Sequence, residues 1–124
     1  MGARESLLTA FAYQDIFGYV VAFSSVSFDD YIASGSSYVP DFKLDDASDG
    51  FRYVLINVGQ TDTLKSVTAN IDKKLTAAGV AHDYEIVPMS GLEDLFGHVP
   101  SVWRQGLHDF VLNIFGSEYD ISAN

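Results

Sequence analysis

One apolar run constrains the fold of this chain more than any other feature. Residues 53–58, Tyr-Val-Leu-Ile-Asn-Val, end at Gly59, and Asp62 follows three residues later. A run without clean alternation between apolar and polar residues is typical of a strand buried on both faces of a parallel sheet. The run therefore predicts a buried β-strand, and Asp62 is expected at its carboxyl end, where α/β proteins place functional loops.

The segments around this run alternate between helical and extended patterns. Apolar spacing predicts further strands at residues 18–23 and 83–87, and helices at 4–13, 63–78 and from Pro100 to the stop at Gly116. Such alternation implies parallel strands joined by right-handed crossovers. We expect an α/β fold with three parallel strands and flanking helices, which opens on a helix as if the front half of the sheet were missing.

Three further expectations concern burial and connections. Residues 18–23 lack alternation, which predicts a strand buried on both faces. The last helix is expected to bury one apolar face made of Val102, Trp103, Leu107, Phe110, Val111, Ile114 and Phe115. Residues 24–50 predict a long surface connection with one short helix at 29–33, residues 89–98 a loop, and residues 117–124 a tail.

Composition excludes several classes of function. The chain has 124 residues, which suits one domain, and a formal net charge of −10 from 17 acidic residues against 7 Lys plus Arg. This charge disfavours nucleic acid and anionic membranes as partners. The absence of cysteine excludes disulfides, thiolate catalysis and cysteine zinc sites. No run is long enough to span a membrane, the first five residues are unlike a signal peptide, and no cofactor motif is found.

Two residues are candidates for acid–base chemistry. Asp62 follows a predicted buried strand, where a carboxylate can orient an imidazole and stabilise its cation. Because Asp62 also precedes a helix, a helix-capping role is about equally supported. His98 follows the next strand in a loop that contains Gly97, which suits a general base, although a surface loop histidine is the simpler alternative for it alone.

Other polar residues favour structural interpretations. His82 lies at the start of a predicted strand, and His108 lies in the last helix, so both are expected to be structural or solvated. Asp45, Asp49 and Gly50 match part of a calcium loop, but Ala47 and Ile56 break its pattern. We therefore expect no metal site. No Gly-x-Ser-x-Gly motif is present, so no serine is marked as a nucleophile on a strand-to-helix turn.

Four blocks together resemble the carboxyl-terminal half of the α/β-hydrolase esterases that include feruloyl esterases, enterochelin-esterase-like proteins and S-formylglutathione hydrolases. The chain matches, in order, the residues after the family's serine in Gly-x-Ser-Met-Gly-Gly, the strand Asp-x-Phe-x-Tyr-x-x-x-Phe-Ser, the Gly-x-x-Asp segment, and Gly-Gly-His followed by Trp-x-x-Leu-x-x-Phe. The matching residues are 1–7, 15–24, 58–64, and 97–98 with 102–110. The order and spacing of the blocks make the resemblance fairly specific.

The resemblance implies a role for three positions. Asp62 matches the acid of the catalytic triad, His98 matches its base, and the backbone N–H of Met1 matches an oxyanion-hole donor. The family's nucleophilic serine would lie immediately before Met1. On this basis residues 1–116 are expected to be the carboxyl-terminal half of a hydrolase of small-molecule or carbohydrate-linked esters. Without its serine, the chain alone is expected to be impaired or inactive.

A second hypothesis involves no catalysis. Without further strands beside it, the strand at 18–23 would be an exposed apolar edge, and the helical stripe of Leu7, Leu8 and Phe11 would lack a packing partner. Such surfaces predict a homo-oligomer or a complementing amino-terminal fragment. A third hypothesis, weaker than these two, is a divergent hydrolase that uses Ser6 or Ser24 as its nucleophile.

Overall fold

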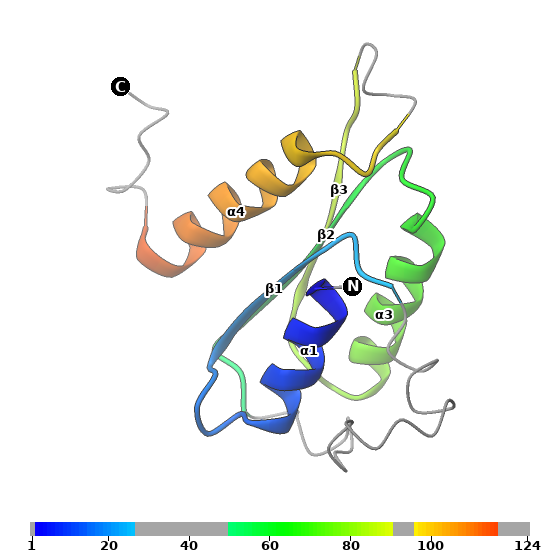
Figure 1. Cartoon of the computed structure of the whole chain (residues 1–124). Coiled ribbons are helices and arrows are strands. Elements are labelled where there is room, and N and C mark those ends of the chain that lie inside the picture. The colour runs from blue at the N-terminus through cyan, green and yellow to red at the C-terminus, as the bar shows by residue number, and fades with distance from the viewer. Residues whose placement is uncertain (1, 27–49, 91–95, 117–124) are drawn as a thin grey trace.

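The computed structural model describes residues 2–26, 50–90 and 96–116 (Figure 1). The predictions for Met1, for the helix at 29–33, for Asp45 and Asp49 and for the tail at 117–124 concern residues outside these ranges. In chain order the elements are α1 (Gly2–Ala12), β1 (Tyr19–Phe23), β2 (Tyr53–Gly59), α3 (Lys65–Ala77), β3 (Asp83–Val87) and α4 (Pro100–Phe115). No helix among the described residues has the length and apolar character needed to cross a bilayer.

The three strands form one parallel sheet in the order β1-β2-β3. Tyr19 pairs with Tyr53 in the first ladder, and Leu55 pairs with Asp83 in the second. The prediction of an α/β arrangement with three parallel strands and flanking helices is therefore confirmed. Parallel pairing brings the carboxyl ends of the strands to the same edge of the sheet, and this edge carries the candidate site.

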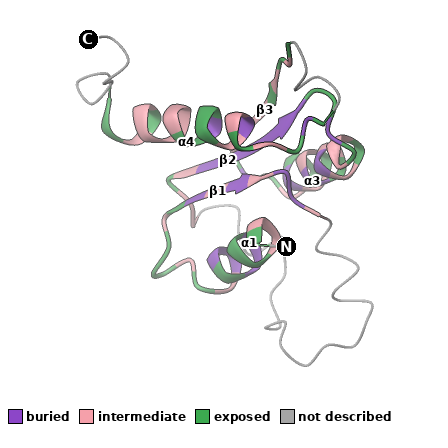
Figure 2. Cartoon of the chain, turned by 45° about the horizontal axis from the view of Figure 1, so that its top comes forward, coloured by how far each residue is buried: buried purple, intermediate pink, exposed green. Residues whose placement is uncertain are grey.

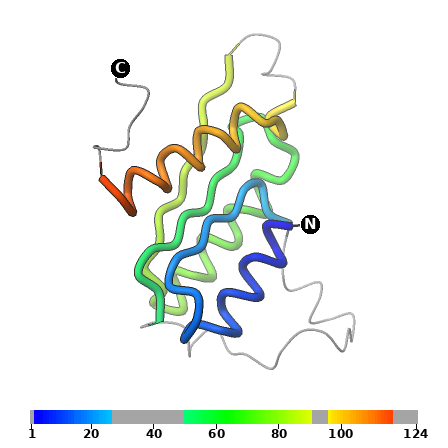
Figure 3. The backbone as a smooth tube through the Cα atoms, turned by 60° about the vertical axis from the view of Figure 1, so that its left-hand side comes forward, coloured from blue at the N-terminus to red at the C-terminus, as the bar shows by residue number. Residues whose placement is uncertain are grey.

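Helices cover both faces of the sheet. Figures 2 and 3 show α1 and α3 together on one face and α4 on the other. The main core lies between β2 and the α1/α3 layer, and its buried members include Val54, Ile56, Ile71 and Leu75. Because β2 is covered on both faces, its residues from Val54 to Gly59 are all buried, as its unbroken apolar run predicts.

The expectation that β1 is buried on both faces is wrong. Val20 and Ala22 are buried, whereas Tyr19 is 41% exposed, because β1 lies at the edge of the sheet. The expectation that the α1 stripe lacks a partner is also wrong. Leu7 and Phe11 are buried in the core cluster that includes Val20 and Ala22, so α1 packs on β1 itself.

The apolar face of α4 is buried less than expected. Val102 and Gly106 are buried, whereas Leu107 is 50% exposed and Phe115 is exposed as well. Figure 1 gives the reason, because the last turns of α4 extend beyond the sheet and have no strand beneath them. The packing of α4 on the sheet therefore weakens toward the carboxyl end of the helix, beyond Phe110, whose ring stacks on Tyr53 of β2.

The predicted helix ends are close to the observed ones. Pro100 is the first residue of α4, where its missing N–H costs no helical hydrogen bond, and Gly116 follows the last residue. Gly79 has φ of 74° just after α3, a conformation that glycine adopts without strain. α3 begins at Lys65 rather than Thr63, because Asp62 forms a turn before the helix.

Candidate active site

The loops that follow the strands leave from the same edge of the sheet. Ser24 N–H, just after β1, donates to the carbonyl of Asn57 at 2.7 Å, and Gln60 N–H, just after β2, donates to the carbonyl of Val87 at 2.9 Å. These bonds hold the three carboxyl ends level with one another. Asp62 in the β2–α3 connection and His98 in the β3–α4 connection are thereby brought together, as the sequence predicts for groups at this edge.

The two carboxylate oxygens of Asp62 have different hydrogen-bond partners. Its Oδ1 accepts a hydrogen bond from Leu64 N–H at 2.8 Å, which stabilises the turn before α3. Its Oδ2 lies 3.0 Å from His98 Nδ1. The side chain is buried, so both contacts are shielded from water. Asp62 therefore has both roles that the sequence leaves open. One oxygen accepts the hydrogen bond of the turn before α3, and the other is the partner of the histidine.

His98 is held in one tautomer by this contact. A carboxylate only accepts hydrogen bonds, so the proton of the neutral imidazole lies on Nδ1 and Nε2 is left to accept a proton. The His98 side chain is 51% exposed, whereas that of Asp62 is fully buried. A buried carboxylate behind an accessible imidazole is the arrangement that a general base requires.

Two glycines allow the histidine loop to approach β2 closely. A Cβ on Gly59 would lie 2.1 Å from the Gly97 carbonyl oxygen, and a Cβ on Gly97 would lie 2.3 Å from the Asp62 nitrogen. Gly97 N–H also donates to Thr61 Oγ1 at 3.1 Å. The backbone beside His98 is thus packed directly on the turn that carries Asp62.

Trp103 lies at the site, although helical spacing predicts a core position for it. Its ring meets the His98 ring edge to face, with centroids 5.2 Å apart. Its Nε1–H donates to Ser24 Oγ at 3.3 Å. Trp103 is in the first turn of α4, five residues after His98, and that proximity is the sequence signal that favours a place beside the histidine.

A small hollow opens beside the imidazole. It has a volume of about 190 Å³ and is lined by Thr61, Thr63, Phe96 and His98. Phe96 is 69% exposed there, which is unusual for a large apolar side chain. The hollow gives a small ligand access to the imidazole.

No serine named by the sequence hypotheses is bonded to His98 in the described part of the chain. Ser24 is the one non-glycine residue there with positive φ, 47°, and it follows β1 at the correct edge. It is buried, and its hydroxyl is engaged by Trp103. Ser6 lies on α1 and lines a different groove. The structure thus brings Asp62 and His98 together, with neither of these two serines bonded to the imidazole.

The other two histidines have acidic partners away from this pair. His82 Nε2 lies 2.9 Å from Asp72 Oδ1, which joins α3 to the start of β3. His108 Nδ1 lies 3.1 Å from Asp109 Oδ1 on α4. Within the described ranges no cluster of three or more His, Asp or Glu side chains could hold a metal ion.

A pair of acids lies between β3 and α4. Burial raises the pKa of Glu85, and its hydrogen bond with Asp109 raises it further, against the opposing bond from Asn57. Burial acts to raise the pKa of Asp109, but hydrogen bonds from Glu85, Gln105 and His108 outweigh it and lower that pKa. Glu85 therefore holds a proton more readily than an ordinary glutamate, and Asp109 accepts its hydrogen bond.

Glu85→Gln should raise the free energy of unfolding at neutral pH and leave it nearly unchanged at pH 4. The stabilisation from protonated Glu85 is fully present below the ordinary glutamate pKa of 4.5 and is lost as the pH rises through the raised pKa. Glutamine supplies an amide N–H donor to Asp109 at every pH, in place of the carboxyl O–H of protonated Glu85. Urea denaturation from pH 4 to 8 tests this, and an equal effect of the substitution at both ends of the range would contradict it.

No protein-family model matches this chain, and a comparison with curated proteins found no similar sequence. Support for an esterase function therefore comes from the four motif blocks and from the geometry of Asp62 and His98.

Proposed function

We propose that this chain carries the acid–base pair of a serine carboxylic-ester hydrolase with an α/β-hydrolase fold, and that the nucleophilic serine lies outside its 124 residues. The observation that carries the proposal is the 3.0 Å contact between buried Asp62 Oδ2 and His98 Nδ1 at the carboxyl edge of a parallel sheet. The motif resemblance supports the same two residues. The substrate class it implies is a small-molecule or carbohydrate-linked ester, hydrolysed without a cofactor.

In each step of the proposed hydrolysis, His98 accepts or donates one proton. The serine oxygen attacks the ester carbonyl carbon while His98 Nε2 takes the hydroxyl proton, and Asp62 stabilises the resulting imidazolium. The carbonyl electrons move to an oxyanion held by backbone N–H groups, of which the resemblance assigns one to Met1. When this intermediate collapses, the alcohol leaves with the proton from His98. Water then repeats the sequence on the acyl-enzyme and releases the acid.

Labelling with a fluorophosphonate tests the proposal. The purified chain alone should form no adduct, because neither Ser6 nor Ser24 is bonded to His98. A form extended by the residues encoded in frame before Met1 should form one adduct, on a serine of the added segment. Intact mass and peptide mapping locate the adduct, and His98→Ala should abolish it.

The possible results have distinct meanings. A His98-dependent adduct on a serine of this chain would show that the nucleophile has been assigned to the wrong segment. Absence of a His98-dependent adduct from the extended form would remove the esterase proposal itself. The second result would favour the alternative, a non-catalytic module that associates through the open edge of β1.

A further inference from the structure

The contact with Asp62 fixes only one atom of the His98 ring. It joins Asp62 Oδ2 to Nδ1 at 3.0 Å. The torsion that turns an imidazole about its bond to Cβ has broad energy wells, so one hydrogen bond leaves the ring some freedom to rotate. About half of the His98 side chain is exposed to solvent. The direction of Nε2, where a general base takes its proton, therefore depends on what else contacts the ring.

Trp103 provides a second contact with the imidazole. The two rings meet edge to face, with centroids 5.2 Å apart and planes at 82°. This is a favoured geometry for a pair of aromatic rings. Because the indole is large and flat, it restricts rotation of the imidazole as long as the indole itself is held in place.

The indole is held by Ser24. Trp103 Nε1–H donates to Ser24 Oγ at 3.3 Å. Ser24 is buried, and its own N–H donates to the carbonyl of Asn57 at 2.7 Å, so the acceptor belongs to the end of the sheet. A Cβ on Gly106, three residues after Trp103, would lie 2.7 Å from Asn57 Cγ. This part of α4 is therefore packed directly on β2, on the face that Gly106 shares with Trp103.

The backbone of Ser24 gives independent support. Its φ of 47° lies in a region that glycine adopts freely and other residues adopt rarely. Residues kept in such conformations cluster at functional sites. Glycine at this position would relieve the strain but would offer no hydroxyl to the indole. The side chain of Ser24, rather than its backbone, thus explains why a serine is found there.

We propose that Trp103 is a positioning residue for His98 and that Ser24 anchors it. The indole, held by the Ser24 hydroxyl, keeps the imidazole in the orientation in which Nδ1 faces Asp62 and Nε2 remains open to a substrate. The inference rests on the proposed function, since the direction of Nε2 matters only where His98 acts as a base. It assigns Ser24 a supporting role in place of the nucleophilic role in the third sequence hypothesis.

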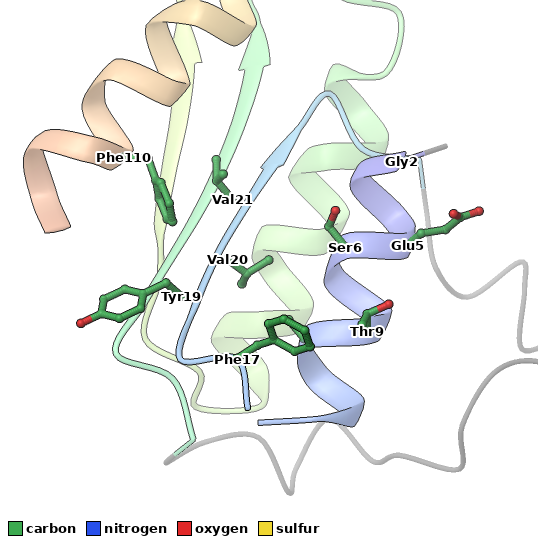
Figure 4. Close-up of a pocket in the computed structure, with 10 residues that line it drawn as sticks. Gly2, Glu5, Ser6, Thr9, Phe17, Tyr19, Val20, Val21 and Phe110 are labelled. Atoms are coloured by element: carbon green, nitrogen blue, oxygen red, sulfur yellow. The ribbon is translucent and has the colours of Figure 1, made fainter. Parts of the chain in front are cut away.

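Ser6 provides a matched control for Ser24. Figure 4 shows Ser6 on α1, in a groove of about 490 Å³ that α1 shares with Tyr19 of β1. Neither His98 nor Trp103 lines this groove. Ser6→Ala therefore makes the same chemical change as Ser24→Ala without altering the contact between the two rings.

NMR of the chain alone tests the positioning directly. Trp103 is the single tryptophan of the chain, so benzothienylalanine, which has the same fused rings without the N–H, can replace it alone. With this analogue, and in Ser24→Ala, the ring-current shifts of the His98 ring protons should shrink. Exchange of the His98 Nδ1–H with water should accelerate by about tenfold. Ser6→Ala should leave both unchanged, and the amide spectrum should show that each form is folded. The analogue keeps the test available even if Ser24→Ala does not fold.

Kinetics of the extended form that carries the nucleophile test the consequence for the reaction. Ser24→Ala should lower kcat for ester hydrolysis by about tenfold and leave KM nearly unchanged, because a misplaced base impairs the chemical step and not the binding of the ester. Trp103→Phe keeps an aromatic ring without an N–H and should show the same division between kcat and KM. Rates are expressed per site that a fluorophosphonate labels, so that unfolded protein does not lower kcat.

Failure of this inference is distinguishable from failure of the proposed function. Unchanged His98 signals with the analogue and in Ser24→Ala would overturn the positioning role, as would an unchanged kcat in an active extended form. An adduct on Ser24 would overturn its role as an anchor. An extended form without a His98-dependent adduct would remove the hydrolase proposal, and the positioning role with it, even if the ring signals change as expected.

Discussion

Asp62→Asn should lower kcat for ester hydrolysis by about 10⁴ in the extended form proposed to carry the nucleophile, the size of loss seen when the triad acid of a serine protease is changed in this way. Asparagine retains an oxygen to accept the bond from Leu64 N–H, which Asp62 Oδ1 accepts at 2.8 Å. In place of Oδ2 it presents an amide donor to His98 Nδ1. The imidazole is then expected to carry its proton on Nε2, where it cannot accept one from serine.

Three measurements separate this effect from loss of structure. The melting temperature should change little in Asp62→Asn, whereas Asp62→Ala removes both oxygens and should cost about 1 kcal/mol of stability. Nitrogen-15 shifts of the His98 ring should report the change of tautomer even in the chain alone. Adding His98→Ala should cause little further loss, because the two residues act as a unit. Activity within tenfold of the unchanged protein in Asp62→Asn would contradict the assigned role.

Gly59→Ala should lower the free energy of unfolding by about 1–3 kcal/mol, the range found when atoms are forced into a packed interior. The new Cβ would lie 2.1 Å from the Gly97 carbonyl oxygen and 2.9 Å from its carbon, and both atoms are backbone. The loop must therefore move away from β2, and it carries His98 away from Asp62.

Gly18→Ala is the matched control, since its Cβ would meet only the Arg52 side chain, at 3.6 Å. It should leave the urea midpoint nearly unchanged. In Gly59→Ala the midpoint should fall, and the ring signals of His98 should indicate loss of the contact with Asp62. A variant with the original midpoint and an intact contact would show that the two glycines do not hold the site.

The sequence predicts those parts of the fold that local patterns determine. The run at 53–58 identifies β2 because a strand covered on both faces must be apolar throughout, and Pro100 and Gly116 mark the ends of α4 through their own backbone preferences. Burial of β1 and of the far part of α4 depends on how many strands lie beside them. A pattern within one segment contains no such information, so the sequence predicts more burial for both segments than the structure has.

In the candidate site, too, some features follow from sequence patterns and others depend on tertiary contacts. Asp62 and His98 could be predicted because topology places the ends of parallel strands at one edge. The contact between Trp103 and Ser24 could not be predicted, because helical spacing indicates which face of a helix an aromatic residue lies on but not which residue it contacts. The close approach of Gly59 and Gly97 likewise joins residues far apart in sequence, and neither glycine alone indicates the other.

The all-parallel pairing has a consequence for how the chain folds. Tyr19 pairs with Tyr53 and Leu55 with Asp83, so each ladder joins residues roughly 30 positions apart. No hairpin among the described residues can form early, and the entropy of closing a long loop precedes the first strand contact. Folding is therefore expected to be slow for a chain of this length. During synthesis β2 emerges before β3, and over that interval its apolar run depends on α1, β1 and the newly emerged α3 for cover.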